Sequence, residues 1–109
     1  MKVSDVFYRG IPGAEDFQPV LDIQWGGGYE WDDLFAWYSP SKRRFFWVEG
    51  SGCSCNSITD GYHMVEDFSS GNRDALVSAV RAKHGNQYKY SPGQELPDIA
   101  TVKNFRTNA

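Results

Sequence analysis

The sequence has only two cysteines and no apolar run of about 18 residues, and each absence excludes a class of protein. Two cysteines are too few for a disulfide-rich scaffold, and without a long apolar run we expect no membrane-spanning helix. The first ten residues carry charges at Lys2, Asp5 and Arg9, where a signal peptide would need an apolar stretch. We therefore expect a cytoplasmic protein that makes no contact with a membrane.

Motifs that would indicate an enzyme or a cofactor are also scarce. We recognise no Ser-His-Asp set, no nucleophile elbow and no internal repeat. The three glycines at residues 26–28 resemble a phosphate cradle, but a dinucleotide site needs a helix after them, and the residues that follow favour a strand. We expect a hairpin turn there, a protein that is not an enzyme, and no cofactor other than the zinc considered below.

Aromatic residues, by contrast, are abundant and unevenly placed. The chain of 109 residues is 40% hydrophobic and 16% aromatic, so it has enough apolar surface to fold as a single domain. All four tryptophans lie between Trp25 and Trp47, together with five other aromatic residues. This segment predicts strands over residues 20–25, 34–39 and 45–48, with extended structure resuming at 29–31. The last two strands are apolar on both faces, so we expect each face to be covered.

One helix is indicated over residues 72–83, where Asn72 is placed to cap the start and Gly85 to follow the end. Apolar residues recur at helical spacing within it, so it should cover one face of the sheet. The N-terminal segment, the tail or a partner would cover the other face. A long loop over residues 49–71 is expected to hold a short strand near 62–65, and the tail a short helix after Pro97.

The predicted fold class is therefore α+β, with a small antiparallel sheet of three to five strands and one main helix packed on one face. Four parts make up the predicted domain. They are an N-terminal segment (1–18), a strand meander with a cysteine-containing loop (19–70), the helix (71–85) and a peripheral tail (86–109).

Charge is also unevenly distributed along the chain. Residues 1–33 carry seven acidic and two basic residues, whereas residues 68–109 carry three acidic and six basic ones, within a net charge of −3. Clustered Lys and Arg supply most of the affinity for nucleic acid, so the acidic first third argues against nucleic acid as the main partner. Weak nucleic-acid binding is kept as an alternative function, through Lys42, Arg43 and Arg44, which lie beside the aromatic strands.

Two groups of residues offer metal ligands. Cys53, Cys55 and His63 are of the types that zinc prefers, so a small zinc protein is an alternative, although zinc sites usually place more residues between two cysteines. The simpler interpretation is two thiols packed in a turn, without a disulfide, which would close a very small ring. Glu30 and Asp32 project from the same face of a strand and could hold a divalent cation, but such acids are more often the solvent face of a strand.

A longer motif joins the aromatic strands to the cysteine turn. It consists of a Tyr/Trp-rich strand pair followed by a Ser-Gly-Cys-Ser-Cys turn: Tyr29-Glu30-Trp31-Asp32, Ala36-Trp37-Tyr38 and Phe46-Trp47-Val48-Glu49-Gly50-Ser51-Gly52-Cys53-Ser54-Cys55. The motif, with the loop and helix after it, resembles a family of small domains associated with actinobacteria and their bacteriophages, over about residues 27–81. Members often continue the turn with Pro and aromatic residues, where this chain has Asn56-Ser57-Ile58. The resemblance implies an actinobacterial or phage origin and no known activity.

The function we expect is a non-enzymatic protein-interaction module, an accessory protein of phage origin acting in the host cytoplasm. Its partner would be a host or phage protein, or a second copy of the chain. Tryptophan, tyrosine and arginine dominate protein interfaces, so we expect the aromatic strands and the loop over residues 50–56 to form the contact surface. The expected contact residues of the strands are Trp31, Trp37, Tyr38, Phe46, Trp47, Arg43 and Arg44.

Overall fold

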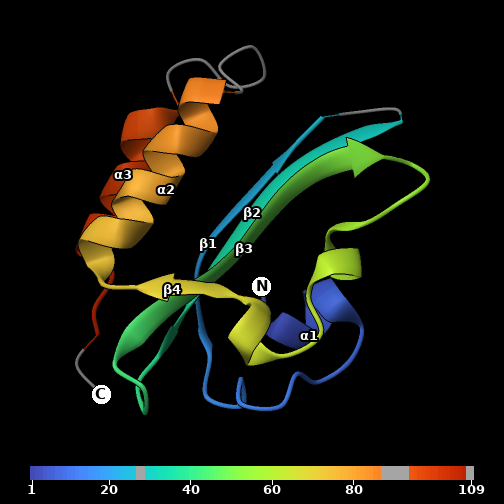
Figure 1. Cartoon of the computed structure of the whole chain (residues 1–109). Coiled ribbons are helices and arrows are strands. Elements are labelled where there is room, and N and C mark those ends of the chain that lie inside the picture. The colour runs from blue at the N-terminus through green and yellow to red at the C-terminus, as the bar shows by residue number, and fades with distance from the viewer. Residues whose placement is uncertain (27–28, 87–93, 108–109) are drawn as a thin grey trace.

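A computed structural model of the chain describes residues 1–26, 29–86 and 94–107, which form helices on both sides of a four-stranded sheet (Figure 1). In chain order the elements are α1 (Val3–Phe7), β1 (Gln18–Trp25), β2 (Glu30–Ser39), β3 (Arg44–Cys53), the 3-10 helices η1 (Ile58–Gly61) and η2 (Val65–Asp67), β4 (Ser69–Gly71), α2 (Arg73–Asn86) and α3 (Glu95–Asn104). Within these residues, no helix has the length and apolarity needed to cross a membrane.

The sheet has the order β1-β2-β3-β4, and every neighbouring pair is antiparallel, which confirms the predicted α+β class. The expected strands at 29–31 and 34–39 are one continuous strand, β2, and the strand expected at 45–48 extends to Cys53. The turn expected at residues 26–28 lies partly outside the described residues. Because β4 pairs only with residues 45–47 of β3, the rest of β3 has no strand on its outer side in the described chain.

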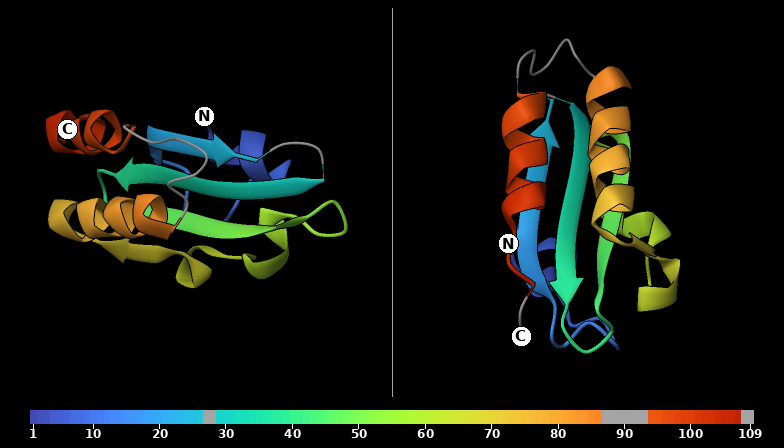
Figure 2. Two further views of the ribbon diagram at one scale, coloured as in Figure 1. Left: turned by 90° about the horizontal axis from the view of Figure 1, so that it is seen from above. Right: turned by 90° about the vertical axis from the view of Figure 1, so that its left-hand side faces the viewer.

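The two faces of the sheet have separate cores, as their two-sided apolar pattern predicts. On one face, side chains of β1, β2 and β3 pack against α2 and α3, which lie side by side across the sheet (Figure 2). On the opposite face, alternate side chains of β2 and β3 pack against α1, the segment after it and the loop between β3 and β4. The N-terminal segment therefore helps to cover one face of the sheet, and α2 and α3 of the same chain cover the other face.

Helix α2 begins as predicted and ends later. The side chain of Asn72 accepts a hydrogen bond from the backbone N–H of Ala75 at 2.9 Å, which confirms its role as the cap. The helix continues to Asn86, so the prediction that Gly85 follows its end is wrong. Glycine stops a helix where its backbone turns left-handed, and Gly85 is not among the glycines with positive φ.

The tail forms the expected helix, but this helix is not peripheral. Ile99 and Val102 of α3 are buried in the same core as α2. A buried pair joins the two helices, since Nε2 of His84 lies 2.8 Å from Oδ2 of Asp98. The rings of Trp25 and His84 pack edge to face, at 4.8 Å between ring centroids. These contacts come from residues far apart in the sequence, so the spacing of the tail alone did not indicate them.

Asp16 ties the N-terminal segment to the turn between β2 and β3. Its carboxylate accepts hydrogen bonds from the hydroxyl of Ser39 at 2.9 Å and from the backbone N–H of Ser41 at 2.8 Å. Burial opposes the charged form, but the hydrogen bonds from Ser41 and Ser39 outweigh it and hold the pKa of Asp16 below its ordinary value. Lys42 adds a second tie, donating to the carbonyl of Gly13 at 2.7 Å.

The loop between β3 and β4 contains two 3-10 helices, so the prediction of a strand at residues 62–65 is wrong. Each short helix is closed by a carboxylate that binds a backbone N–H at its start. Asp60 accepts from Ser57 at 3.0 Å, and Asp67 accepts from His63 at 2.9 Å. An Asp side chain that captures nearby backbone N–H groups competes with strand pairing, which explains why the apolar residues of this loop form no strand.

Candidate functional site

Four of the aromatic residues expected on a contact surface lie in the core. Trp37, with 1% of its surface exposed, and Phe46 face the α1 layer, whereas Tyr38 and Trp47 face α2 and α3. The structure therefore contradicts their expected exposure, and of these four residues Trp47 alone is among the lining residues of the cavity described below. The physical reason is that each apolar face of β2 and β3 is covered by another part of the same chain.

The basic residues of the expected surface lie at the opposite end of the β2–β3 hairpin from the cysteine loop. Arg43 and Arg44 are exposed, and Arg43 has a left-handed backbone with φ of 55°. The amine of Lys42 is held by Gly13, as described above. Nucleic-acid binding through this turn remains a prediction.

Trp31 is the one tryptophan of the expected surface that is half-buried rather than part of the core. Its indole N–H donates to the carbonyl oxygens of Cys53 at 3.0 Å and Asn56 at 3.1 Å. The ring lies over Gly50 and Gly52, whose missing side chains leave room for it. Trp31 therefore fixes the cysteine loop against the end of the sheet.

Substitution of Gly52 tests this packing. A Cβ atom at Gly52 would lie 2.9 Å from both the Trp31 ring and the side-chain nitrogen of Asn56, so Gly52→Ala should lower the free energy of unfolding by about 1–3 kcal/mol. Gly50→Ala is the matched control, because its Cβ would lie 3.5 Å from the same ring, an ordinary contact. Urea unfolding measures both. Equal stability of the two variants would contradict the packing described for Trp31.

The two cysteines form a disulfide with each other, contrary to the expectation of free thiols. Asn56 closes the turn around them, accepting from the backbone N–H of Cys53 at 3.1 Å and donating its own N–H to the Cys53 carbonyl. The expected zinc ligands do not converge, because no three His, Cys, Asp or Glu residues in the described ranges are grouped to hold a metal. His63 thus does not complete a site with Cys53 and Cys55.

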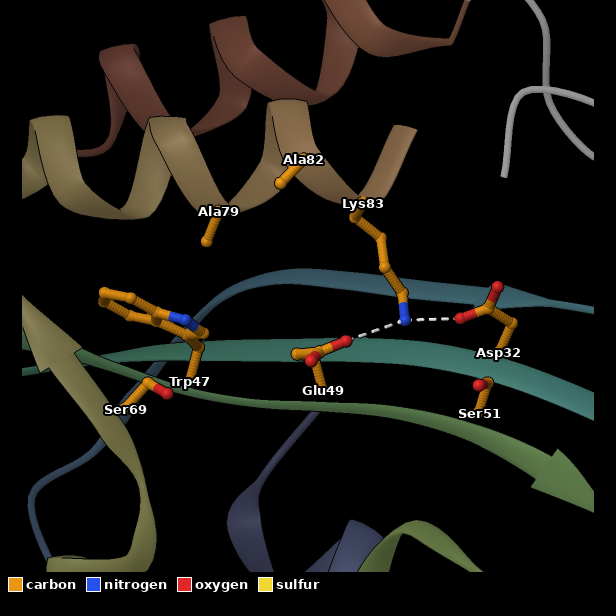
Figure 3. A pocket seen from close by; sticks show the side chains of 8 residues that line it. All are labelled: Asp32, Trp47, Glu49, Ser51, Ser69, Ala79, Ala82 and Lys83. Carbon is orange, nitrogen blue, oxygen red and sulfur yellow. Dashed lines mark hydrogen bonds and ion pairs between the residues drawn. The ribbon is translucent and has the colours of Figure 1, made fainter. Parts of the chain in front are cut away.

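A cavity of about 350 Å³ lies between α2 and the sheet, where β3 continues past the end of β4 (Figure 3). Its walls combine charged, hydroxyl, aromatic and small apolar side chains. They come from Asp32, Trp47, Glu49, Ser51, Ser69, Ala79, Ala82 and Lys83. We name it the Lys83 cavity.

Lys83 reaches from the last turn of α2 to the sheet, and its ammonium group is buried there. It forms an ion pair with Oδ1 of Asp32, lies 3.1 Å from Oε2 of Glu49 and donates to the carbonyl of Gly50 at 3.2 Å. An ammonium group has three N–H donors, and here three oxygens surround it. The ammonium group of Lys83 is therefore paired with oxygens of the protein itself.

Asp32 is less completely satisfied than Lys83. It is 3% exposed, and the described residues give neither carboxylate oxygen a hydrogen-bond partner: Oδ1 forms the ion pair with Lys83, and Oδ2 has no partner of either kind. A buried charged oxygen without a partner is costly, and such groups in native proteins need an explanation. This oxygen is the most unusual polar atom of the site.

The open side of the Lys83 cavity is formed by Glu49, whose side chain is 52% exposed. The hydroxyls of Ser51 and Ser69 lie in the same wall, and both residues are exposed. The ring of Trp47 forms an aromatic wall beside Ala79, as Figure 3 shows. The cavity thus offers hydrogen-bonding groups, a flat apolar surface and an excess of carboxylates.

Two further hollows adjoin the same part of the sheet. One, of about 270 Å³, lies beside Trp31 and Asp33, and the other, of about 470 Å³, lies between Trp31 and Glu49. In the register of the sheet Asp32 and Asp33 pair with Ser51 and Gly50. Successive residues of a strand point to opposite faces, so the Lys83 cavity lies on the α2 face of this stretch and the other two hollows lie on the α1 face. Among their described lining residues Lys83 has the one basic side chain. Six carboxylates line the hollows: Asp5, Asp32, Asp33, Glu49, Asp60 and Asp67. We name this region the acidic end of the sheet.

Asp33 shows the effect of this environment on a carboxyl group. Burial raises the pKa of Asp33 above its ordinary value of 3.8, the nearby charge of Lys83 lowers it, and the charge of Asp32 raises it again. The sum is a raised pKa, so the folded protein binds this proton more tightly than the unfolded chain does.

The free energy of unfolding should therefore depend on pH through the ionisation of Asp33. As pH rises from 3.8 through the raised pKa, ionisation of this carboxyl lowers the stability of the wild-type protein. Asp33→Asn removes this effect, so the variant should gain stability relative to wild type as the pH rises through that window. Urea unfolding at several pH values measures the difference. A relative gain that grows toward lower pH would have the wrong sign for a raised pKa.

Sequence reasoning did not identify the Lys83 cavity. The pattern around Asp32 favours a metal ligand or a solvent-facing acid, and Lys83 lies at the end of the predicted helix with no signal that connects the two residues. Lys83 and Asp32 are 51 positions apart in the sequence, and no local spacing connects them. One signal was present, because Lys83 continues the apolar stripe of α2 that begins at Leu76, and this position faces the sheet.

The sequence model of one protein family matches residues 13–105, which include all four strands and both long helices. No curated protein and no solved structure matches the chain. A family without an assigned activity is what the sequence motif implied, and the expected actinobacterial or phage origin remains a prediction. The chain belongs to the family described as a domain of unknown function (DUF7574).

Proposed function

We propose that this domain is a non-enzymatic protein-interaction module that binds a basic segment of a partner polypeptide at the acidic end of its sheet. The observation that carries the proposal is the excess of acidic residues at this end of the sheet, where one hollow on the α2 face and two on the α1 face are lined by six carboxylates and one lysine. Complementary charge steers association and selects partners, so a basic segment is the occupant that this lining favours.

Two features support binding at this place. Trp31 is half-buried between two of the hollows, and tryptophan at the centre of a contact contributes much of the binding energy in protein interfaces. The basic turn at residues 42–44 lies at the other end of the hairpin, where it does not weaken the negative charge at the acidic end. The expected setting remains a phage accessory protein in the cytoplasm of its host.

A peptide titration tests the proposal. The probe is a short peptide of repeated Arg-Gly-Ser, and the control is the same peptide with Glu in place of Arg. Backbone NMR shifts should move near Trp31, Asp33 and Gly50 with the basic peptide and remain unchanged with the acidic one. Binding should weaken as salt is added, because charge drives it. Equal binding of the two peptides, or shifts confined to residues 42–44, would overturn the proposal.

A further inference from the structure

We infer that the Lys83 cavity is a binding site for a guanidinium group. The inference deepens the proposed function, because an arginine side chain of the basic partner is one source of that group. A small free guanidinium compound is the other source, and the experiment below separates the two.

The charges of the cavity select a cation. A lysine in a cavity often indicates an anion site, but the ammonium group of Lys83 already donates to Glu49 and to the carbonyl of Gly50 and is paired with Asp32. Two carboxylates around one ammonium group leave one negative charge uncompensated. Asp32 and Lys83 form the buried pair, so the half-exposed carboxylate of Glu49 presents the remaining negative charge to an incoming cation.

Asp32 is a second sign that the negative charge around Lys83 is incompletely compensated. Its Oδ2 is buried and unpartnered in the described chain, and the residue lines the cavity. Figure 3 shows the Asp32 carboxylate directing one oxygen to Lys83 and the other away from it. Lys83 compensates one of the two carboxylate charges, and a cation beside Glu49 would compensate the other.

The walls fit a flat group with several donors. A guanidinium group has five N–H donors in one plane, and Glu49, Ser51 and Ser69 supply oxygen acceptors on one side of the cavity. The same plane packs against aromatic rings, and the ring of Trp47, 7% exposed, lines the cavity beside Ala79. No grouping of metal ligands occurs among the described residues, so an organic cation suits the site better than a metal ion.

Methylguanidinium is the direct probe, and methylurea, its neutral isostere, is the control. Saturable shifts of the backbone amides of Glu49 and Ser69 and of the Trp47 indole N–H are expected with methylguanidinium alone. Glu49→Gln should weaken binding by at least about fivefold, because it removes a charge-assisted hydrogen bond. Glu66→Gln, the same change at an exposed acid outside the cavity, should leave binding unchanged. The spectrum of each variant shows whether it is folded.

Each outcome decides between the two claims. If methylguanidinium saturates the cavity but the Arg-Gly-Ser peptide does not bind, the inference stands and the proposed function falls. If the peptide shifts the region of Trp31 but neither methylguanidinium nor Glu49→Gln has an effect, the proposed function stands and the inference falls. Equal shifts with methylurea would mean that the cavity does not select a cation, and shifts that never saturate would mean that it is not a specific site; either result would overturn the inference.

Discussion

Replacing Lys83 with methionine should lower the free energy of unfolding by about 3–5 kcal/mol, because the variant leaves the carboxylate of Asp32 buried without a counter-charge. A domain of this size is stabilised by only about 5–15 kcal/mol, so the change would remove a large share of the total. Urea unfolding at neutral pH measures it. Lys103→Met, the same substitution at an exposed position of α3, should change stability by less than about 0.5 kcal/mol.

A second substitution shows whether this loss comes from the unpaired charge. In the double variant Lys83→Met, Asp32→Leu both charges are gone, and apolar replacement of a buried ion pair is often neutral or stabilising. The double variant should therefore be more stable than Lys83→Met alone. If the single variant loses less than about 1 kcal/mol, or if the double variant recovers nothing, the ion pair does not have the buried environment described here.

Replacing Trp37 with alanine should cost about 3–5 kcal/mol, because it empties a large site in the core between the sheet and α1. The indole N–H of Trp37 also donates to the carbonyl of Met1 at 2.8 Å, so the substitution frees the N-terminal segment as well. Leu96→Ala is the control, since Leu96 is exposed on α3 and its loss should have little effect. Thermal unfolding of the two variants gives the comparison.

This prediction separates two interpretations of the aromatic strands. If they form an exposed contact surface, as the sequence suggested for Trp37, Tyr38, Phe46 and Trp47, the Trp37→Ala variant would remain as stable as the Leu96→Ala variant. If they form the two cores seen in the structure, the tryptophan variant alone should be strongly destabilised.

The parts of the fold that follow from local pattern were predictable. Alternating and two-sided apolar residues in β2 and β3 indicate a sheet covered on both faces, and the capping side chain of Asn72 marks the start of α2. The second helix after Pro97 also follows from its apolar spacing. These features depend on neighbours within a few residues, which a sequence shows directly.

The features that were missed depend on contacts between distant residues. The pairing of His84 with Asp98 makes α3 part of the core, and nothing within α3 indicates a histidine on another helix. In the loop after β3, Asp60 and Asp67 bind backbone N–H groups and replace the expected strand with short helices. A polar side chain that acts through one specific partner has no periodic pattern in the sequence.

The candidate site illustrates the same limit more strongly. Of the residues expected at a contact surface, Trp31 remains half-exposed beside the acidic end, whereas Asp32, Glu49 and Lys83 become important only because β2, β3 and α2 meet there. The uneven charge along the chain was visible early, as an acidic first third. The structure adds two acids from the middle of the loop, Asp60 and Asp67, to the same end of the sheet.

The most direct test of the central claim is a double-mutant cycle across the proposed contact. Glu49→Gln in the protein is combined with replacement of one arginine of the basic peptide by citrulline, its neutral isostere. Close charge pairs across an interface show coupling energies of about 1.5 kcal/mol or more, so at least one arginine position should couple to Glu49 by that amount. A coupling energy indistinguishable from zero at every arginine position, with the peptide still bound, would contradict an arginine side chain in the Lys83 cavity.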